Sequence, residues 1–596
     1  MPARSNAFSP AHARDFTADR RLAALCLAGL VVGALSTVAA WVLLGAIHFF
    51  TNLFYFRTFS LVPHTPAEAH LGLAGILVPV IGGLIVGVIA RFGSDKIRGH
   101  GIPEALESIL FGGSRMSPRV ALLKPLASGI AIGSGGPFGA EGPIIMTGGA
   151  AASLLAQLLH LSAAERKSLL VAGACAGMTA VFGTPLAAIL LGVELLLFEL
   201  RPRSLLPVSV ACGVAGLLRP LWANALPLFE LQTGAVSVIA LPSCIVAGLC
   251  SGALAAGASR LVYGTEDAFE RLRLHWMWWP ALGGLAVGIG GWFEPRALGI
   301  GYDVINDLLH GHLLAWAAVS LLVVKLIIWA VALGSGTSGG VLAPVLMMGA
   351  GLGAVLGPWL PGGSIELWAL VCMAATFGAA MGAPLAATVF AFGVTHDAQA
   401  MVAVILGCTA AHGFSVIVMH RSILTERIAR RGRHVLREFG VDPLERRHVA
   451  EVMTLEVVTV PAQRTVAEIL EGWFGPTQPH RAYPVVDGDR LLGMLDRELL
   501  SDLPPESADL PVSNLFQDLG PPQTISPQAT CRAAATQLTA ADAQRMAVTD
   551  PEGRLLGIVS RSDLLKPSQE LHTEEVLRER TWDPLQVSPS DAPPSR

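Results

Sequence analysis

A run of glycines that carries a single carboxylate interrupts the apolar part of this chain. The run extends from Gly133 to Pro143, between two long apolar stretches, and its only charged residue is Glu141. Irregular backbone inside a lipid bilayer leaves N–H and C=O groups unpaired at a high cost in free energy, so it persists only where protein buries it or water reaches it. A broken helix that bears an ionisable residue at this depth indicates an ion site.

The composition is typical of a membrane protein. Of 596 residues, 52% are hydrophobic and 14% are charged, whereas soluble proteins carry about 25% charged residues. The net charge is -4 and the basic residues stand beside apolar segments, so we expect no nucleic-acid partner. The eight cysteines form no CxxC pair and no spacing typical of metal ligands, so we interpret them as packing residues and expect no metal site.

Apolar segments follow one another from residue 22 to residue 419. The first, Leu22 to Ile47, is too long for a cleavable signal peptide and is expected to remain as a membrane helix. Several later segments are too short or too rich in glycine to span, which predicts half-helices that meet near the middle of the bilayer. Arginines flank both ends of the apolar region, so the positive-inside rule places both termini in the cytoplasm.

Two motifs occur twice in the apolar region. Phe182 to Val193 returns as Met381 to Phe392, and the turn from Gly139 to Pro143 returns as Gly340 to Pro344, each about 200 residues further along. Two different motifs that recur after nearly the same number of residues predict a duplicated unit. Duplication together with broken helices is typical of transporters. Chance similarity between glycine-rich apolar segments is the alternative. The sequence does not show whether the two halves are inverted.

Three glycine-containing motifs stand before apolar segments, in a fixed order. They are Gly99-His100-Gly101-Ile102-Pro103-Glu104, Gly139-Ala140-Glu141-Gly142-Pro143 and Gly340-Val341-Leu342-Ala343-Pro344. The first resembles the GSGIPE motif of the CLC family of chloride channels and chloride/proton antiporters, the second its GREGP motif and the third its GxFxP motif. This resemblance implies an all-helical polytopic membrane fold, a CLC-like inverted repeat of tilted and broken helices. It also implies a homodimer in the bilayer with one chloride pore in each subunit.

The chemistry of these motifs agrees with an anion site. Glycine lets the backbone approach an ion, and proline starts the following helix without wasting a donor, so amide groups from Gly340 to Leu342 can face an anion. Helix ends hold chloride more weakly than a full lysine charge would, which permits rapid exit. The resemblance implies these anion-binding positions: Gly99, His100, Gly101, Ile102, Pro103, Gly139, Ala140, Gly142, Pro143, Gly340, Val341, Leu342 and Leu424.

Two charged residues receive roles from the resemblance. Glu141 corresponds to the gating glutamate, whose carboxylate competes with chloride for the external site and leaves when it is protonated or displaced. A glutamate that caps a helix start is the alternative. Lys124 matches a family lysine and is expected to bias the electrostatic potential of the pore, whereas snorkelling to the membrane interface is the alternative.

The chain departs from the family pattern at four positions. His100 stands where the family has the serine that coordinates the central anion, so an imidazole replaces a hydroxyl donor. A charged His100 would hold chloride longer and make conduction fall as pH rises, whereas a neutral one would have little effect. The family phenylalanine of GxFxP and the inner-gate tyrosine fall on Leu342 and Leu424, so we expect an apolar inner gate. Ala140 replaces the arginine of GREGP.

Beyond Gly432 the composition becomes that of a soluble protein. Two units, residues 449–505 and 510–567, each predict a strand, a helix, a strand hairpin and a final helix, which resembles a tandem pair of α+β CBS domains. This resemblance implies ATP, ADP or AMP as a ligand, with Ser560 and Asp563 at its ribose hydroxyls, and no other cofactor. A purely structural role in dimerisation is the alternative.

The pair Glu194-Leu195 bears on the choice between a channel and an antiporter. Antiporters of the family usually have two acidic residues here, and the second passes protons towards the cytoplasm. Leu195 cannot titrate, so proton entry would need a water wire or another carboxylate, such as Glu194 or Glu199. We therefore favour a channel, with a chloride/proton antiporter that uses the same pore as the alternative.

Two other function classes fit less well. A CBS-bearing magnesium channel is a distant alternative, because it would line its path with acidic side chains. We find neither a nucleophile with its base nor a metal-ligand set such as HExxH, so we do not expect an enzyme.

These observations divide the chain into five parts in a bacterial inner (plasma) membrane protein. They are a cytoplasmic N-terminal segment (1–21), an anion-transport domain (22–432, with repeats of about 22–230 and 231–432), two CBS domains (449–505 and 510–567) and a Pro- and Ser-rich tail (582–596) expected to be disordered.

Overall fold

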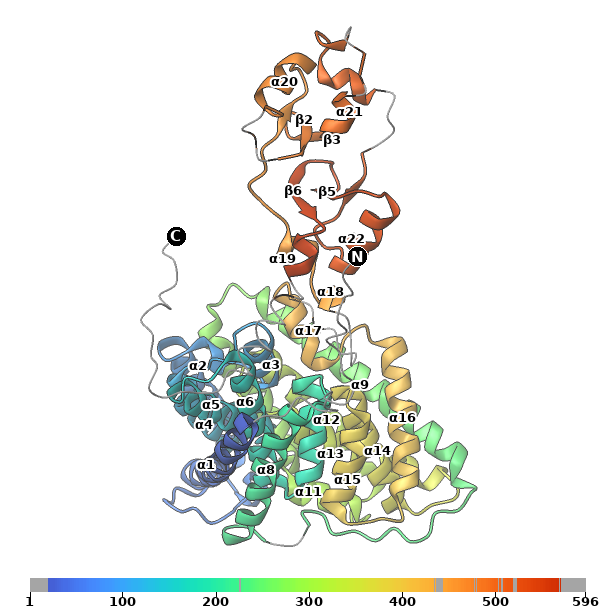
Figure 1. Cartoon of the computed structure of the whole chain (residues 1–596). Helices are drawn as coiled ribbons and strands as arrows, with labels where there is room; N and C mark the ends of the chain where they lie inside the picture. Colours follow the sequence, from blue (N-terminus) through green and yellow to red (C-terminus); the bar gives the residue numbers. More distant parts are fainter. Residues whose placement is uncertain are drawn as a thin grey trace. The chain divides into compact units, whose positions relative to one another are not determined.

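The computed structural model describes residues 20–224, 227–433, 435, 443–475, 478, 480–501, 503–504, 507–517, 522–566 and 569. The chain forms a helical unit up to Arg437 and a smaller unit, Glu438–Leu577, and each is described by itself (Figure 1). The N-terminal segment expected over residues 1–21, apart from its last two residues, and the expected tail 582–596 lie outside the described residues.

Within its described residues, the helical unit has two successive sets of eight α-helices and one further α-helix. The first set is α1 (Arg20–Thr51), α2 (Leu77–Phe92), α3 (Ile102–Leu110), α4 (Pro118–Gly133), α5 (Glu141–Leu158), α6 (Ala163–Phe182), α7 (Pro185–Leu191) and α8 (Pro202–Leu218). The second set is α9 (Ala240–Glu270), α10 (Trp279–Phe293), α11 (Tyr302–Leu309), α12 (Ala315–Gly334), α13 (Leu342–Leu356), α14 (Ile365–Met381), α15 (Pro384–Thr395) and α16 (Met401–Val418). The further helix is α17 (Ile423–Arg430).

The two sets pack in the same way and are related by an internal twofold axis. In the first set α5 packs on α6 and α1 on α8; in the second α13 packs on α14 and α9 on α16. A Cβ at Gly83 of α2 would meet the Pro280 carbonyl of α10, and a Cβ at Gly284 of α10 would meet the Pro79 carbonyl of α2. Such reciprocal contacts are the mark of a twofold relation. The equivalent helices α3 and α11 lie towards opposite ends of the unit in Figure 1, as an inverted repeat requires.

Two long apolar segments, residues 168–198 and 366–393, are each broken at a glycine. Gly183 (φ 74°) separates α6 from α7, and Gly382 (φ 67°) separates α14 from α15. In each case a proline, Pro185 or Pro384, begins the next helix. Hydropathy misses these breaks because the side chains remain apolar on both sides of a left-handed residue that glycine adopts readily.

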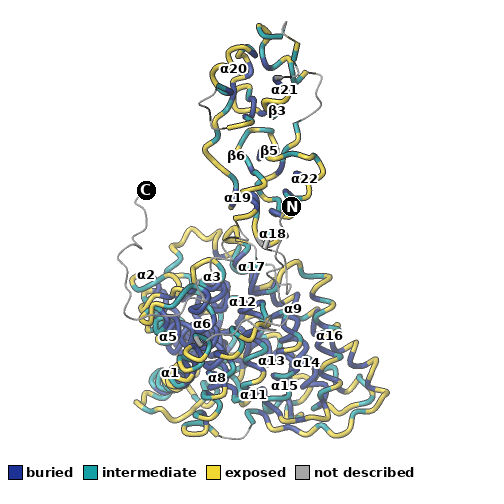
Figure 2. The backbone as a smooth tube through the Cα atoms, in the orientation of Figure 1, coloured by how far each residue is buried: buried dark blue, intermediate teal, exposed yellow. Residues whose placement is uncertain are grey.

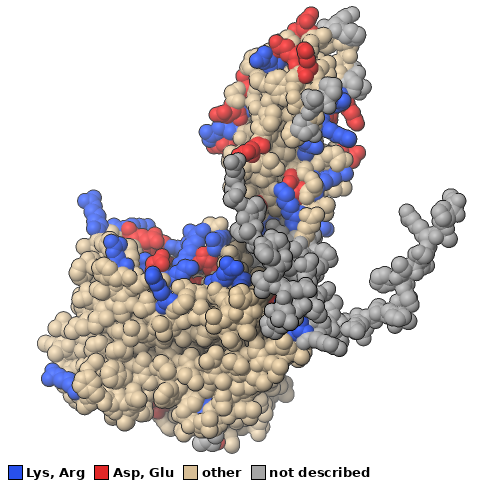
Figure 3. Space-filling model, turned by 60° about the vertical axis from the view of Figure 1, so that its left-hand side comes forward, with Lys and Arg blue, Asp and Glu red and all other residues tan. Residues whose placement is uncertain are grey.

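The helical unit has the surface of a membrane protein. Among its described residues, seven helices are long and apolar enough to cross a membrane. Figure 3 shows an uncharged flank, with the Lys and Arg side chains of this face gathered mostly at one end. Buried residues are concentrated in α5, α6, α13 and α14 (Figure 2), and these helices are mostly apolar around their whole circumference, as helices surrounded by protein must be.

The smaller unit contains two similar α+β modules. The first has the sheet order β1-β2-β3, formed by β1 (Val460–Pro461), β2 (Ala482–Asp487) and β3 (Arg490–Asp496), with α20 (Val466–Gly472) and α21 (Arg497–Ser501). The second has the order β4-β5-β6, formed by β4 (Thr524–Ile525), β5 (Arg545–Thr549) and β6 (Leu555–Ser560), with α22 (Cys531–Ala540) and the 3-10 turn η13 (Asp563–Leu565). In both sheets the first pair is parallel and the second is the antiparallel hairpin that the sequence predicted. The final helix expected in the second module is a 3-10 turn within the described residues.

The two modules exchange their leading segments. Two short helices, α18 (Pro443–Arg446) and α19 (Val449–Val452), precede the first module, yet Val449 and Val452 pack in the core of the second. Conversely, η12 (Val512–Phe516) lies in the range expected for the second module, yet Val512 packs in the core of the first. The module boundaries in space therefore differ from those along the chain, which start at residues 449 and 510.

Candidate functional site

The first turns of α3, α5 and α13 meet at one point inside the helical unit. Gly340 N–H donates to the Gly139 carbonyl at 2.9 Å, and Gly139 N–H donates to the Gly340 carbonyl at 3.3 Å. A Cβ at Gly101 would lie 2.8 Å from the Gly142 carbonyl oxygen. Residues that are more than 200 positions apart thus form one cluster of helix N-termini, whose unpaired amide groups and partial positive charge attract anions.

Glycine is required where these segments cross. A Cβ on Gly142 would collide with the His100 carbonyl and lie 3.3 Å from the Gly340 Cα. Gly99 and Gly101 have φ angles of 80° and 88°, which side-chain-bearing residues rarely adopt. The anion-binding positions expected on α3, α5 and α13 are therefore brought together by close backbone contact.

The Glu141 carboxylate lies between the N-termini of α5 and α13. The side chain is fully buried, and a Cβ on Gly340 would lie 2.6 Å from its Oε2. The backbone amide groups of Glu141 itself and of Ala343 stabilise the negative charge of the carboxylate. Within the described residues, Oε2 has no hydrogen-bond partner. The residue therefore does more than cap its own helix: its charge occupies a position towards which two helix starts are directed.

A residue that sequence reasoning missed also contacts this carboxylate. Tyr302, the first residue of α11, donates its hydroxyl hydrogen bond to Glu141 Oε1 at 3.3 Å. Tyr302 follows Gly299-Ile300-Gly301, which is the second-repeat counterpart of Gly99-His100-Gly101. Extending the repeat alignment to this segment would have drawn attention to it.

Two buried lysines occupy equivalent positions in the two halves. Lys124 on α4 donates to the carbonyls of Ile97 and Gly99, each at 2.8 Å. Lys325 on α12, which sequence reasoning also missed, donates to the carbonyls of Ala297 and Gly299, each at 2.9 Å. Both lysines are fully buried, so Lys124 does not snorkel to an interface. Each ammonium instead fixes the loop before a short helix and puts a positive charge behind it.

His100 is buried within a group of charged residues. It is 2% exposed, and its Nδ1 has no hydrogen-bond partner within the described residues. Glu104 of α3 lies beside it and pairs with Arg427 of α17 and with Arg431, which directly follows that helix, at 3.6 Å each. His100 therefore offers one unengaged ring nitrogen close to the meeting point of the helices.

Three apolar residues among the expected anion-binding positions are buried, and two of them, Leu342 and Leu424, are those of the expected inner gate. Ile102 begins α3, Leu342 begins α13 and Leu424 lies in the first turn of α17. α17 packs on α3 and α14. Leu424 thus reaches the interior from a helix outside the two repeats.

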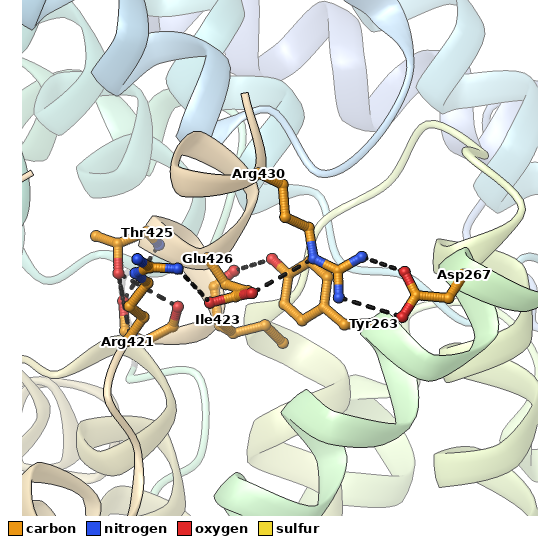
Figure 4. A network of polar contacts seen from close by, with 8 residues as sticks. Tyr263, Asp267, Arg421, Ile423, Thr425, Glu426 and Arg430 are labelled. Carbon is orange, nitrogen blue, oxygen red and sulfur yellow. Dashed lines mark hydrogen bonds and ion pairs between the residues drawn. The ribbon is translucent and has the colours of Figure 1, made fainter. Parts of the chain in front are cut away.

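Polar contacts hold α17 against α9 (Figure 4). Tyr263 of α9 donates its hydroxyl to the Ile423 carbonyl at 2.5 Å, and Arg430 pairs with Asp267 of α9. Arg430 also stacks over the Tyr263 ring at 4.7 Å. A phenol therefore lies at the start of α17, but its hydroxyl is used to anchor the backbone.

Glu194 does not join the cluster around Glu141. It lies in a π-helical turn after α7 (Gly192–Leu197), and its carboxylate accepts from the amides of Leu385 at 3.3 Å and Ala386 at 2.8 Å. Both amides are in the first turn of α15, so Glu194 caps that helix. The adjacent Leu195 is buried.

Ser560 and Asp563 bind each other at the end of β6. The Ser560 hydroxyl donates to Asp563 Oδ2 at 2.6 Å, and Lys566 Nζ lies 2.6 Å from Asp563 Oδ1. Burial raises the pKa of Asp563, but the hydrogen bonds from Lys566 and Ser560 outweigh it and leave the pKa below its ordinary value. Both side chains expected at a nucleotide are thus engaged within the protein.

Across the parts of the chain that the structure describes, no three His, Cys, Asp or Glu side chains are grouped as metal ligands would be.

The sequence matches two known protein families and several described proteins. Residues 82–416 match the profile of the family described as voltage gated chloride channel, and residues 449–502 and 513–570 match the CBS domain. A Ralstonia nicotianae protein described as ClcB-like is 32% identical over 351 residues, which cover 56% of this chain and 81% of that protein. The Salmonella typhimurium voltage-gated ClC-type chloride channel ClcB is 30% identical over 369 residues, which cover 59% and 87%.

A solved structure supports the same fold. The crystal structure of a eukaryotic CLC transporter superposes with a TM-score of 0.61 at 19% identity, and the match covers 91% of this chain and 98% of that chain.

Proposed function

The chain belongs to the voltage gated chloride channel family, and from that premise we propose that its helical unit conducts chloride through a pore that Glu141 gates. The membrane location, the CLC-like helical fold and the CBS pair that the sequence predicted are confirmed. Chloride is the proposed substrate of the site where α3, α5 and α13 meet.

The position of the Glu141 carboxylate carries this proposal. A carboxylate between two helix N-termini occupies the space that an anion would take, and its Oε2 is left without a hydrogen-bond partner among the described residues. The energy gained from the helix ends offsets only part of the cost of burying that charge. Protonation or a competing chloride would release the side chain, which is what a gate requires.

The groups on the α17 side suit passage of an anion. His100 offers an unengaged ring nitrogen, and Lys124 places a buried positive charge behind the loop that carries it. The Lys124 ammonium is bound to backbone carbonyls and does not contact the anion directly, so chloride would be held weakly enough to leave. The apolar side chains of Ile102, Leu342 and Leu424 form the proposed inner gate.

The environment of Glu194 supports a channel rather than an antiporter. Its carboxylate caps α15, and its neighbour Leu195 is buried and cannot carry protons. A chloride/proton antiporter that uses the same pore is the second candidate, because Glu141 alone can exchange protons with one side. It would need a proton route that bypasses Leu195.

We extend the proposal to the whole chain in three respects. The protein acts as a homodimer in a bacterial inner membrane, with one pore in each subunit. Its termini face the cytoplasm, because α17 and the residues next to it carry arginines. The CBS pair, residues 449–505 and 510–567, binds at most one adenine nucleotide, because the first module has no aspartate at the place that matches Asp563. A ligand at Ser560 and Asp563 would have to displace Lys566.

Chloride efflux from liposomes that contain the purified protein tests the gate and the mode of transport. Internal pH is followed at the same time, and a Glu141→Ala variant is measured in parallel. We expect efflux without uphill proton movement, and an equal or higher rate in the variant. Proton pumping driven by chloride, lost in the variant, would instead establish the antiporter. Absence of chloride flux from both proteins would refute the proposed pore.

A further inference from the structure

We propose that Tyr302 latches Glu141 in the position that closes the pore, and that the cavity beside Tyr302 gives solvent its access to this carboxylate. The inference rests on the proposed function, because it assigns a positioning residue and a proton entry to that gate.

The contact with Tyr302 is specific to one oxygen of the gate. The Tyr302 hydroxyl donates to Glu141 Oε1 at 3.3 Å, while Oε2 faces the Gly139 and Gly340 backbone. Within the described residues, this is the one hydrogen bond to the carboxylate from another side chain. A donor to the charged form stabilises that form in place, and the effect is larger inside a protein than in water.

The Tyr302 ring is held by other aromatic rings. Phe182 of α6 and Phe229 meet it edge to face, with ring centroids 6.0 Å and 6.2 Å away. Phe390 of α15 in turn packs edge to face against Phe182 at 5.0 Å. Because these rings restrict the tilt of Tyr302, its hydroxyl is directed at the carboxylate before any anion arrives.

A cavity of about 210 Å³ lies on the other side of Tyr302. Its wall includes His48 and Thr51 of α1 and the segment from Leu298 to Val304. His64, Arg296 and Asp303 also line it and are exposed, so the cavity opens to solvent. Apolar side chains form most of its wall, but His48, Thr51, Arg296 and Asp303 supply polar groups, and it is large enough to hold water. Glu141 does not line it, whereas Tyr302 does, so the tyrosine stands between the water and the gate.

The charges near Tyr302 also favour the charged form of Glu141. The buried ammonium of Lys325 on α12 attracts the Glu141 carboxylate, and the carboxylate of Asp303 on α11 stabilises the charge of Lys325. With Tyr302, these are the titratable side chains of the described residues that bear on the closed gate from the helices packed around it. Lys325 and the phenol both favour the charged carboxylate, so loss of the phenol alone weakens closure without abolishing it.

The test measures chloride efflux from liposomes as a function of pH on the cavity side. Tyr302→Phe keeps the ring and its packing and removes the hydroxyl. We expect its efflux at pH 7 to rise about tenfold or more, the usual effect of losing one hydrogen bond to a charged group, and the pH of half-maximal efflux to move upward. Tyr55→Phe is the matched control, because Tyr55 is a buried phenol of the same unit that donates to the Ser134 carbonyl. Its pH profile should equal that of the wild type.

A double variant separates the latch from the gate. Adding Tyr302→Phe to Glu141→Ala should change neither the rate nor the pH profile further, because no carboxylate remains to be held. If Glu141→Ala changes the efflux rate but Tyr302→Phe leaves the pH profile of the wild type unchanged, the role of Tyr302 is overturned and the role of Glu141 as the gate is not. Equal effects of Tyr302→Phe in both backgrounds also overturn it. No chloride flux in any protein overturns the proposed function itself.

The cavity is tested by blocking it. In Ile300→Cys the new thiol lies in the wall of the cavity, and a bulky thiol reagent on that side should slow the response of efflux to a pH jump severalfold. The wild type treated with the same reagent controls for the native cysteines. An unchanged response in labelled Ile300→Cys overturns the cavity as the route to Glu141.

Discussion

At the scale of single residues, three buried charges of the helical unit lie at or behind the point where its helix starts meet. Glu141, Lys124 and Lys325 are each fully buried, and each contacts backbone groups or a specific side chain. Burying a charge is costly unless it is paired, so such residues are retained for a function. The lysines hold the loops before α3 and α11, and Glu141 lies where the helix starts converge.

Removal of the Lys124 ammonium should loosen the loop before α3. Lys124→Met leaves the carbonyls of Ile97 and Gly99 without their donor, which should lower the free energy of unfolding in detergent by about 2 kcal/mol and reduce chloride efflux. Lys96→Met, at an exposed lysine of the same loop, is the control and should alter neither quantity. Equal effects of the two substitutions would show that Lys124 contributes only net charge.

The pairing of Asp563 predicts a pH-dependent stability at the end of β6. Its folded-state pKa is below the ordinary value, so the carboxylate stabilises the fold above the unfolded-state pKa of about 4, and that stabilisation is lost as pH falls through the folded-state pKa. Hydrogen exchange of residues 560–566 in the full-length protein should accelerate in that acid range, beyond the intrinsic pH dependence of exchange. In Asp563→Asn, protection should be weaker at pH 7 and should lack this acid step.

The sequence identifies the residues of the first half of the site better than those of the second. Glu141 and His100 stand in short glycine-rich motifs, so their context is visible. In the second half, Asp303 and Val304 occupy the places of Pro103 and Glu104, and only the two glycines around Ile300 remain of the motif. Tyr302 and Lys325 therefore stand in segments whose relation to the site emerges only from the fold.

At the scale of elements, the site is made by helices that start inside the unit. α3, α5 and α13 begin at glycine turns in its interior, so the amide groups of their first turns lie close to one another. The sequence predicts these short helices, because glycine and proline mark their starts. It does not predict which starts meet, since that depends on contacts between residues about 200 positions apart.

Adding one methyl group at the meeting point should block transport. Gly142→Ala places a Cβ against the His100 carbonyl, so the first turns of α3 and α5 must separate. We expect chloride efflux to fall at least tenfold, because misplacement of about 1 Å is enough to disrupt a preorganised site. Gly45→Ala in α1 is the control, since a Cβ there meets nothing within 4 Å. Wild-type efflux from Gly142→Ala would contradict the close crossing of these helices.

At the scale of the whole molecule, the internal twofold axis explains why one site draws on both halves. The reciprocal contacts of α2 with α10, and the bridge between Gly139 and Gly340, put the two glycine turns face to face. The sequence indicates the duplication through its repeated motifs. It does not reveal the inversion, because the direction in which a half crosses the unit is a property of the packed structure.

The proposed homodimer predicts a mass of two chains in mild detergent. Leu186 on α7 and Leu385 on α15 occupy the same position of the repeated motif and are 60% and 64% exposed. We expect a second copy of the chain to cover them. Replacing both by tryptophan should shift the mass measured by light scattering towards a single chain. Leu27→Trp, at an equally exposed position of α1, should not. A single-chain mass for the wild type would refute the dimer.

The central claim is that an anion and the Glu141 carboxylate compete for one position between α5 and α13. Anomalous diffraction from crystals of Glu141→Ala grown in bromide tests it most directly. We predict a bromide peak beside the amides of the first turn of α13, close to Gly340 and Ala343, and a weaker or absent peak in the wild type. A bromide peak in the wild type as strong as in the variant, or none near this turn in either protein, would contradict the account.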